Sequence, residues 1–104
     1  MIQVIATIEI AAGKRAEFIT AFRANVPHVL AEEGCIEYEP MVDLATEIPA
    51  QPAVRADVLV VIEKWENLAR LKAHLVAPHM ASYRERVKHL VKGVSIQVLE
   101  SARA

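Results

Sequence analysis

The chain of 104 residues has a formal net charge of −1, and 54% of its residues are apolar, so we expect residues 1–104 to form one domain. Acidic and basic residues are interspersed without a basic patch, which argues against a nucleic-acid partner. No apolar run is long enough to span a membrane, and no signal peptide is apparent. The single cysteine, Cys35, cannot form an internal disulfide. These features favour the reducing cytoplasm as the location.

The first two elements follow from hydrophobic periodicity. Residues 2–10 alternate apolar and polar side chains, which predicts a strand with its even-numbered residues on one face. Residues 14–33 carry apolar side chains at helical spacing and predict a helix. Within it, Pro27 predicts a kink or a break into two pieces, and Gly34 is expected to end it.

A second strand is predicted over residues 35–44. Pro40 cannot donate a ladder hydrogen bond, so this strand should lie at the edge of the sheet or carry a bulge. Its alternation predicts one face with Ile36, Tyr38 and Val42, and another with Glu37, Glu39 and Met41. Residues 45–55 contain two prolines and are expected to form a loop.

The second half of the chain predicts a buried strand, a helical region and a last strand. Residues 56–65 are almost continuously apolar, which is typical of a strand buried on both faces. Asn67 is a suitable N-cap for a helix, Pro78 restarts the helix, and Gly93 is expected to end it before a strand at 94–100. In the apolar strand, alternation separates Val58, Val60 and Ile62 from Leu59, Val61 and Trp65.

The predicted order is β-α-β-β-α-β, which is the α+β ferredoxin-like arrangement. Right-handed crossovers place both helices on one face of the sheet and leave the other face bare. We expect a homodimer that covers this open face, to which we assign Val61, by packing two sheets into an α/β barrel. The alternative is a monomer whose open face is partly polar through Gln3, Thr7, Ser95 and Gln97.

Two segments, "VLAEEGCIEYEPMVD" and "IEKWENLARLKAHLVAPHM", resemble the antibiotic biosynthesis monooxygenase family, and most closely its bacterial quinol monooxygenases. The likeness runs from Val4 to Leu99, and "EEGC", the E-x-W pattern and "HLxxPHM" make it specific. It implies a dimeric α/β barrel and oxygen-dependent chemistry on quinols without flavin, haem or metal. Relatives include haem-degrading enzymes and isomerases, so the resemblance alone leaves the reaction open.

Cofactor sites are not expected. The chain has only three glycines and no glycine-rich phosphate loop, and its histidines and cysteine lack the spacing of a zinc site. Compared with the haem-degrading relatives, the first strand has no asparagine, His74 stands at the place of their helical tryptophan, and Arg84 stands near the place of their histidine. We therefore expect the protein to bind neither metal nor cofactor.

His74 and His79 are the candidate catalytic residues. Without the resemblance, His74 reads as a half-buried structural histidine; with it, His74 is expected to project into a cavity between sheet and helices. His79 follows Pro78 at a helix start, where the helix dipole disfavours a protonated imidazole. A neutral histidine can act as a general base near pH 7, and a solvent-facing His79 is the alternative. Which of the two is the base stays open.

The substrate-binding candidates are the aromatic, acidic and thioether side chains of the same region: Tyr38, Glu63, Trp65, Met80 and Tyr83. We expect Trp65 to be a core residue; the alternative is that it lines a cavity that binds an aromatic substrate. Glu63 either pairs with a cation such as Arg86 or lies in the cavity. Tyr83 is four residues after His79, so both are expected on one helical face.

Together these features predict a cofactor-independent monooxygenase that oxidises a small quinol or polyphenolic aromatic with dioxygen. A histidine would remove a phenolic proton, and the anion would give electrons to oxygen in a cavity that excludes water. Two alternatives remain open: an acid–base isomerase of the same fold, and a dimeric module that binds a small aromatic without catalysis.

Overall fold

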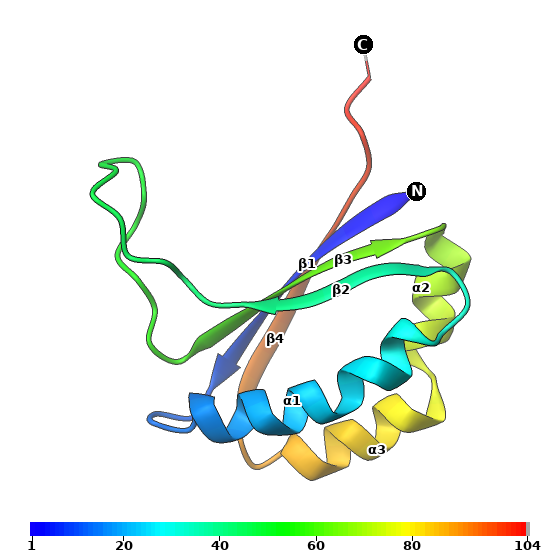
Figure 1. Cartoon of the computed structure of the whole chain (residues 1–104), viewed down its shortest axis with the longest axis horizontal. Coiled ribbons are helices and arrows are strands. Elements are labelled where there is room, and N and C mark those ends of the chain that lie inside the picture. Colours follow the sequence, from blue (N-terminus) through cyan, green and yellow to red (C-terminus); the bar gives the residue numbers. More distant parts are fainter. Residues whose placement is uncertain (104) are drawn as a thin grey trace.

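The structure, a computed structural model, describes residues 1–103, which form a four-stranded antiparallel sheet with its helices on one face (Figure 1). In chain order the elements are β1 (Ile2–Ile10), α1 (Arg15–Leu30), β2 (Cys35–Met41), β3 (Val58–Trp65), α2 (Leu68–Leu75), α3 (Pro78–Val87) and β4 (Val91–Leu99). The strand order is β2-β3-β1-β4. The predicted α+β ferredoxin-like fold is confirmed, with the second helical region divided into α2 and α3.

The core lies between the sheet and the helices. Alternation in β1 places Val4, Ala6, Ile8 and Ile10 on the buried face, as predicted. Opposite them, α1 contributes Phe18, Phe22 and Val29, which are almost fully buried. Because β1 pairs with both β3 and β4, its apolar face is the centre of this layer.

Helix α1 is shorter than predicted, and Pro27 does not break it. The helix continues through Pro27 to Leu30, and the backbone N–H groups of Ala31 and Glu32 close its end on the carbonyl oxygens of Pro27 and Val29. Gly34 lies beyond the helix end and belongs to the turn into β2, where its φ of 84° is left-handed. A Cβ atom at Gly34 would lie 2.4 Å from the Cγ atom of Arg70, so both conformation and space favour glycine there.

Strand β2 lies at the edge of the sheet, as Pro40 predicts. It ends earlier than expected, and its register against β3 shifts near its start. The shift leaves Ile36 exposed, and Val42 lies beyond the strand and is also exposed. The predicted face of Ile36, Tyr38 and Val42 is therefore wrong, since only Tyr38 of the three faces the helices.

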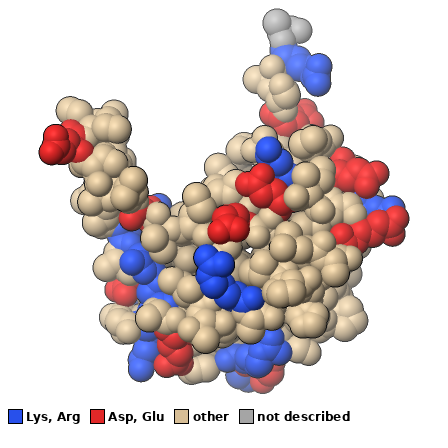
Figure 2. All heavy atoms as spheres, viewed as in Figure 1, with Lys and Arg blue, Asp and Glu red and all other residues tan. Residues whose placement is uncertain are grey.

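Residues 42–57 leave the sheet as a projecting arm. The side chains of Asp43 and Arg55 join the two ends of the arm through two hydrogen bonds of 2.9 Å. Figure 1 shows the arm and the C-terminal segment rising on the side of the sheet opposite the helices, and Figure 2 shows a mostly uncharged arm with acidic atoms at its tip. On the arm, Leu44 and Ile48 are 76% and 62% exposed. No part of residues 1–103 covers these apolar side chains.

Strand β3 has one fully buried face and one partly exposed face. The side chains toward the helices are buried: Leu59, Val61, Glu63 and Trp65. The open face carries Val58, Val60 and Ile62 from β3, with Ile5 from β1 beside them. The assignment of Val61 to the open face is therefore wrong, and within one chain the strand is fully buried on one face only.

The helical region begins and divides where the sequence predicts. The Asn67 side chain accepts the backbone N–H of Arg70 at 3.0 Å and caps α2, and Pro78 begins α3. Gly93 does not end a helix, because α3 ends at Val87 and Gly93 already lies within β4. Of the helices in residues 1–103, none has the length and apolar character needed to cross a membrane.

Candidate active site

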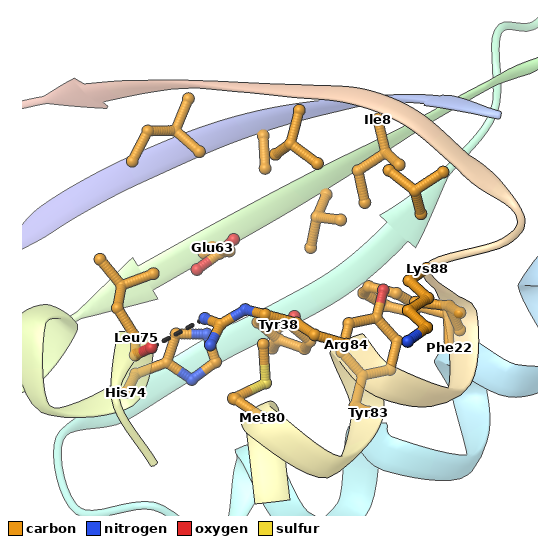
Figure 3. Close-up of a pocket in the computed structure, with 16 residues that line it drawn as sticks. Ile8, Phe22, Tyr38, Glu63, His74, Leu75, Met80, Tyr83, Arg84 and Lys88 are labelled. Carbon is orange, nitrogen blue, oxygen red and sulfur yellow. Dashed lines mark hydrogen bonds between the residues drawn. The ribbon is translucent and has the colours of Figure 1, made fainter. Parts of the chain in front are cut away.

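A cavity of about 420 Å³ lies between the sheet and helices α1, α2 and α3. Most of its wall is apolar, and a few polar side chains converge on it, as in many sites for small molecules. Figure 3 shows Glu63 on the sheet side, with His74 and Arg84 opposite on the helix side. The polar and aromatic residues of the wall are Phe22, Tyr38, Glu63, His74, Tyr83, Arg84 and Lys88.

The structure brings five of the seven predicted site residues to the cavity wall: Tyr38, Glu63, His74, Met80 and Tyr83. The remaining two, Trp65 and His79, do not line it. Trp65 is 0% exposed and lies in the core next to Glu63. His79 and Tyr83 are four residues apart on α3, but of the two only Tyr83 lines the cavity.

Glu63 is a buried carboxyl group, 5% exposed, on β3. Its Oε1 atom accepts a hydrogen bond of 2.9 Å from the indole N–H of Trp65. Burial raises the pKa of Glu63 to about 7, the Trp65 hydrogen bond opposes this rise, and the negative charge of Glu32 adds to it. Arg86 does not pair with it. Of the two interpretations left open by the sequence, the position in the cavity is the one observed.

Glu32 joins the two histidines. This residue follows α1, and its Oε2 atom lies 2.7 Å from Nδ1 of His74 and 3.0 Å from Nε2 of His79. A carboxylate accepts hydrogen bonds only, so each of these ring nitrogens carries the hydrogen. Sequence reasoning missed Glu32 as a site residue, although it stands in the "EEGC" segment that carries the family resemblance.

His74 contacts Glu32 through Nδ1, and within residues 1–103 its Nε2 atom has no hydrogen-bond partner. The residue is 2% exposed, and its ring lies 4.7 Å from the ring of Trp65 and 5.6 Å from that of Tyr38, which fixes its orientation. Burial lowers the pKa of His74 below its ordinary value, and the hydrogen bond to Glu32 opposes this effect. With Nδ1–H donated to Glu32, a neutral His74 leaves Nε2 unprotonated, which is the form a general base requires.

Both ring nitrogens of His79 contact polar side chains that do not line the cavity. Its Nδ1 atom lies 3.3 Å from Oδ1 of Asn25, and its Nε2 atom faces Glu32. The amide nitrogen of the buried Asn25 contacts the sulfur atom of Met80 at 3.3 Å, which directs the amide oxygen toward His79. His79 therefore supports Glu32 and has no free nitrogen for the cavity. Asn25 is the second residue near the site that sequence reasoning missed, because helical periodicity alone does not distinguish it from a core residue.

Three aromatic rings form one end of the wall. The rings of Phe22 and Tyr38 stack with centroids 5.5 Å apart, and Tyr83 meets Phe22 edge-on at 5.9 Å. Burial raises the pKa of both tyrosines far above the ordinary value, so both hydroxyls remain protonated. This end of the cavity offers flat apolar surfaces with hydroxyl donors, which suits an aromatic ligand with oxygen substituents.

Arg84 and Lys88 place positive charge at the cavity. The guanidinium of Arg84 donates a hydrogen bond of 2.8 Å to the carbonyl oxygen of Leu75, which ties α3 to the end of α2 (Figure 3). Lys88 follows directly after the last residue of α3 and pairs with Glu85 at 2.6 Å. Neither residue was predicted to line a site. Within residues 1–103, no three side chains of the His, Cys, Asp and Glu types form a group that could hold a metal ion.

Known proteins share both this sequence pattern and this fold. The family model described as antibiotic biosynthesis monooxygenase matches residues 1–86. "Probable quinol monooxygenase YgiN" of Escherichia coli (strain K12) is 43% identical over 102 residues, which cover 96% of this chain and 97% of that protein.

Solved structures give the same result for the fold. PA3566 from Pseudomonas aeruginosa superposes with a TM-score of 0.79 at 25% identity, covering 98% of this chain and 94% of that chain. Rv0793 from Mycobacterium tuberculosis has a TM-score of 0.77 at 23% identity, covering 99% of this chain and 96% of that chain. The sequence match and the shared fold agree, and the chain belongs to the antibiotic biosynthesis monooxygenase family.

Proposed function

We propose that the protein is a monooxygenase that oxidises a small quinol or related polyphenolic aromatic with dioxygen and requires no bound cofactor. The observation that carries this proposal is the His74 side chain, held by Glu32 with a bare ring nitrogen at a cavity lined by aromatic rings. The similarity to a protein described as a quinol monooxygenase supports the choice of substrate class.

His74 supplies the step that makes such a substrate reactive. Its Nε2 atom removes a phenolic proton, and the resulting anion is a stronger electron donor than the neutral quinol. Transfer of one electron to dioxygen gives a semiquinone and superoxide, which recombine at a ring carbon. Overall, one quinol and one dioxygen give one hydroxyquinone and one water. The protein contributes proton removal, orientation and exclusion of water.

The test is an anaerobic mixture of the protein with a panel of hydroquinones, followed by addition of isotopically labelled dioxygen. We expect a product that carries one labelled oxygen atom, identified by mass spectrometry. Samples without protein are the control, because quinols also oxidise to quinones spontaneously. Formation of quinone at the uncatalysed rate would indicate that the protein is a binding module without catalytic activity. An isomeric product without oxygen consumption would indicate an isomerase.

We also propose that two copies pack through the open faces of their sheets. Ile5, Val60 and Ile62 form an apolar strip on this face, which water would otherwise cover. The projecting arm of residues 42–57 and the C-terminal segment rise on the same side, so they flank whatever covers the sheet (Figure 1). A second copy presents the same apolar strip and is the partner that fits it.

Val60→Lys is expected to weaken this dimer. Each interface would contain two buried ammonium groups without partners, so the dissociation constant should rise at least about 100-fold, or roughly 3 kcal/mol. Sedimentation velocity at micromolar concentrations measures the change. Ala69→Lys, on the exposed surface of α2, is the matched control and should not alter association. A wild-type chain that sediments as a monomer would exclude the dimer.

For the location in the cell we propose the cytoplasm. The single cysteine, Cys35, is a free thiol that cannot form an internal disulfide, which fits a reducing compartment. Cell fractionation with an antibody against the protein tests this, and recovery in an extracellular fraction would contradict it.

A further inference from the structure

Two proton-transfer groups face the cavity from opposite layers of the fold. His74 comes from α2 in the helix layer, and Glu63 comes from β3 in the sheet (Figure 3). Both contact the same indole, because Trp65 packs its ring 4.7 Å from the ring of His74 and donates its N–H to Glu63. The proposed function uses only His74. Insertion of oxygen into a quinol also requires a proton donor.

We propose that Glu63, in its protonated form, is a second catalytic residue, which donates a proton to the peroxide formed on the quinol ring. This inference rests on the proposed function. It also limits the substrates to hydroquinones that carry a hydrogen on a ring carbon next to a hydroxyl-bearing carbon.

The first half of the reaction uses each group once. His74 takes the phenolic proton and becomes an imidazolium. After electron transfer and recombination, a ring carbon carries its hydrogen and a peroxide anion. The carboxyl O–H of Glu63 breaks, its proton forms an O–H bond on the outer peroxide oxygen, and Glu63 is left as a carboxylate.

The second half restores both groups. The Glu63 carboxylate removes the hydrogen from the same ring carbon, and the electron pair of the C–H bond forms a carbon–oxygen double bond. The O–O bond breaks, and the departing hydroxide takes the proton of the His74 imidazolium to become water. The product tautomerises to a hydroxyquinone. Both side chains return to their starting states, so the cycle needs no other acid or base.

The surroundings of Glu63 keep a large fraction of it protonated at neutral pH. It is almost fully buried, no cation forms an ion pair with it within residues 1–103, and burial raises its pKa to about 7. The indole N–H occupies Oε1 only, which leaves Oε2 for the substrate. Glu32, after α1, acts on Glu63 through its charge, and the titratable and charged groups that line the same cavity are Tyr38 on β2, His74 on α2, Tyr83 and Arg84 on α3, and Lys88 just after α3.

Glu63→Gln is the direct test. The glutamine oxygen can still accept the Trp65 hydrogen bond, but the side chain has no acidic proton. We expect kcat for oxygen insertion to fall by about 10²- to 10⁴-fold, with a small change in KM. The product should shift to quinone and hydrogen peroxide, because an unprotonated peroxide leaves the ring instead of losing its outer oxygen. A merely structural role would not change this product ratio.

The pH profile provides an independent measurement on the wild-type protein. Because protonated Glu63 is required, kcat/KM should fall as pH rises through about 7, and the residual rate of Glu63→Gln should lack this decrease. A wild-type rate that does not fall above pH 7 would overturn the proposal without any variant. Tetramethylhydroquinone, which has no ring hydrogen, should give only quinone and hydrogen peroxide.

The controls separate this inference from the proposed function. Glu37→Gln removes a carboxylate that pairs with Lys64 at 3.6 Å outside the cavity, and it should leave oxygen insertion unchanged. Glu63→Gln should melt at a higher temperature than the wild type above pH 7, because the wild type must then bury a charge. A wild-type protein that inserts no oxygen contradicts the proposed function. Insertion by Glu63→Gln at the wild-type rate contradicts only the role of Glu63.

Discussion

His74→Asn is expected to lower the rate of oxygen insertion by about 10²- to 10⁴-fold, because it removes the base that generates the quinol anion. The asparagine amide can still donate a hydrogen bond to Glu32, so the carboxylate keeps a partner and the fold should be retained. His79→Ala should have a much smaller effect, since no nitrogen of His79 faces the cavity and Glu32 keeps its bond of 2.7 Å to His74.

Single-turnover measurements with a preformed complex of protein and hydroquinone distinguish the two substitutions. The His74 variant should bind the hydroquinone and fail to form its anion, which is visible by absorbance under anaerobic conditions. Thermal unfolding provides the check on folding. Full activity in the double variant at normal stability would show that neither histidine is the base and would move the search to the sheet, at Tyr38 or Glu63.

Trp65→Ala is expected to lower the free energy of unfolding by about 3–5 kcal/mol, the usual cost of removing a large buried aromatic side chain. The indole is fully buried and, among the side chains of residues 1–103, donates the one hydrogen bond that Glu63 accepts. Its loss leaves a void beside His74 and a buried carboxyl group without a donor, and both effects destabilise the folded chain.

Urea denaturation at fixed protein concentration measures this cost, since association would otherwise change the apparent stability. Trp65→Phe is the matched variant, because it keeps most of the ring volume and removes only the N–H donor. It should cost less than the alanine substitution. A loss of less than about 1 kcal/mol for Trp65→Ala would show that the surrounding core relaxes into the space, contrary to the usual behaviour of well-packed interiors.

Local rules predict the elements of this fold well where one residue decides the conformation. Pro40 cannot sit in a central strand, Asn67 has a suitable side chain for an N-cap, and Pro78 must begin a new helix; the structure bears out all three. Pro27 and Gly93 show the limit. A proline near the end of a well-packed helix can be accommodated, and a glycine after a helix can equally belong to the next strand.

Alternation reveals which residues share a face, but the identity of the inner face depends on the rest of the fold. Val61 is the example: its partners on the strand were predicted correctly, and its side was not. The register shift at the start of β2 is a further case, because the bulge depends on pairing with β3. Only the assembled sheet determines either feature.

The candidate site divides in a similar way. Tyr38, Glu63 and His74 could be selected from residue chemistry and family resemblance, and all three line the cavity. Glu32 and Asn25 could not be selected in this way. In the sequence they look like ordinary polar residues of a helix and of the turn after it, and only the packing of α2 and α3 against them reveals their role. The raised pKa of Glu63 likewise arises from burial, which has no signature in the sequence.

The carboxylate shared by the two imidazoles has a consequence for the energetics of electron transfer. When His74 takes up a proton, the new positive charge forms 2.7 Å from Glu32, so a fixed group in the helix layer compensates it before solvent molecules or mobile ions rearrange. Such a pre-arranged counter-charge lowers the reorganisation that accompanies charge separation. Added salt screens exposed charges far more than buried ones, so the chemical step should depend little on ionic strength even where the entry of a charged substrate does.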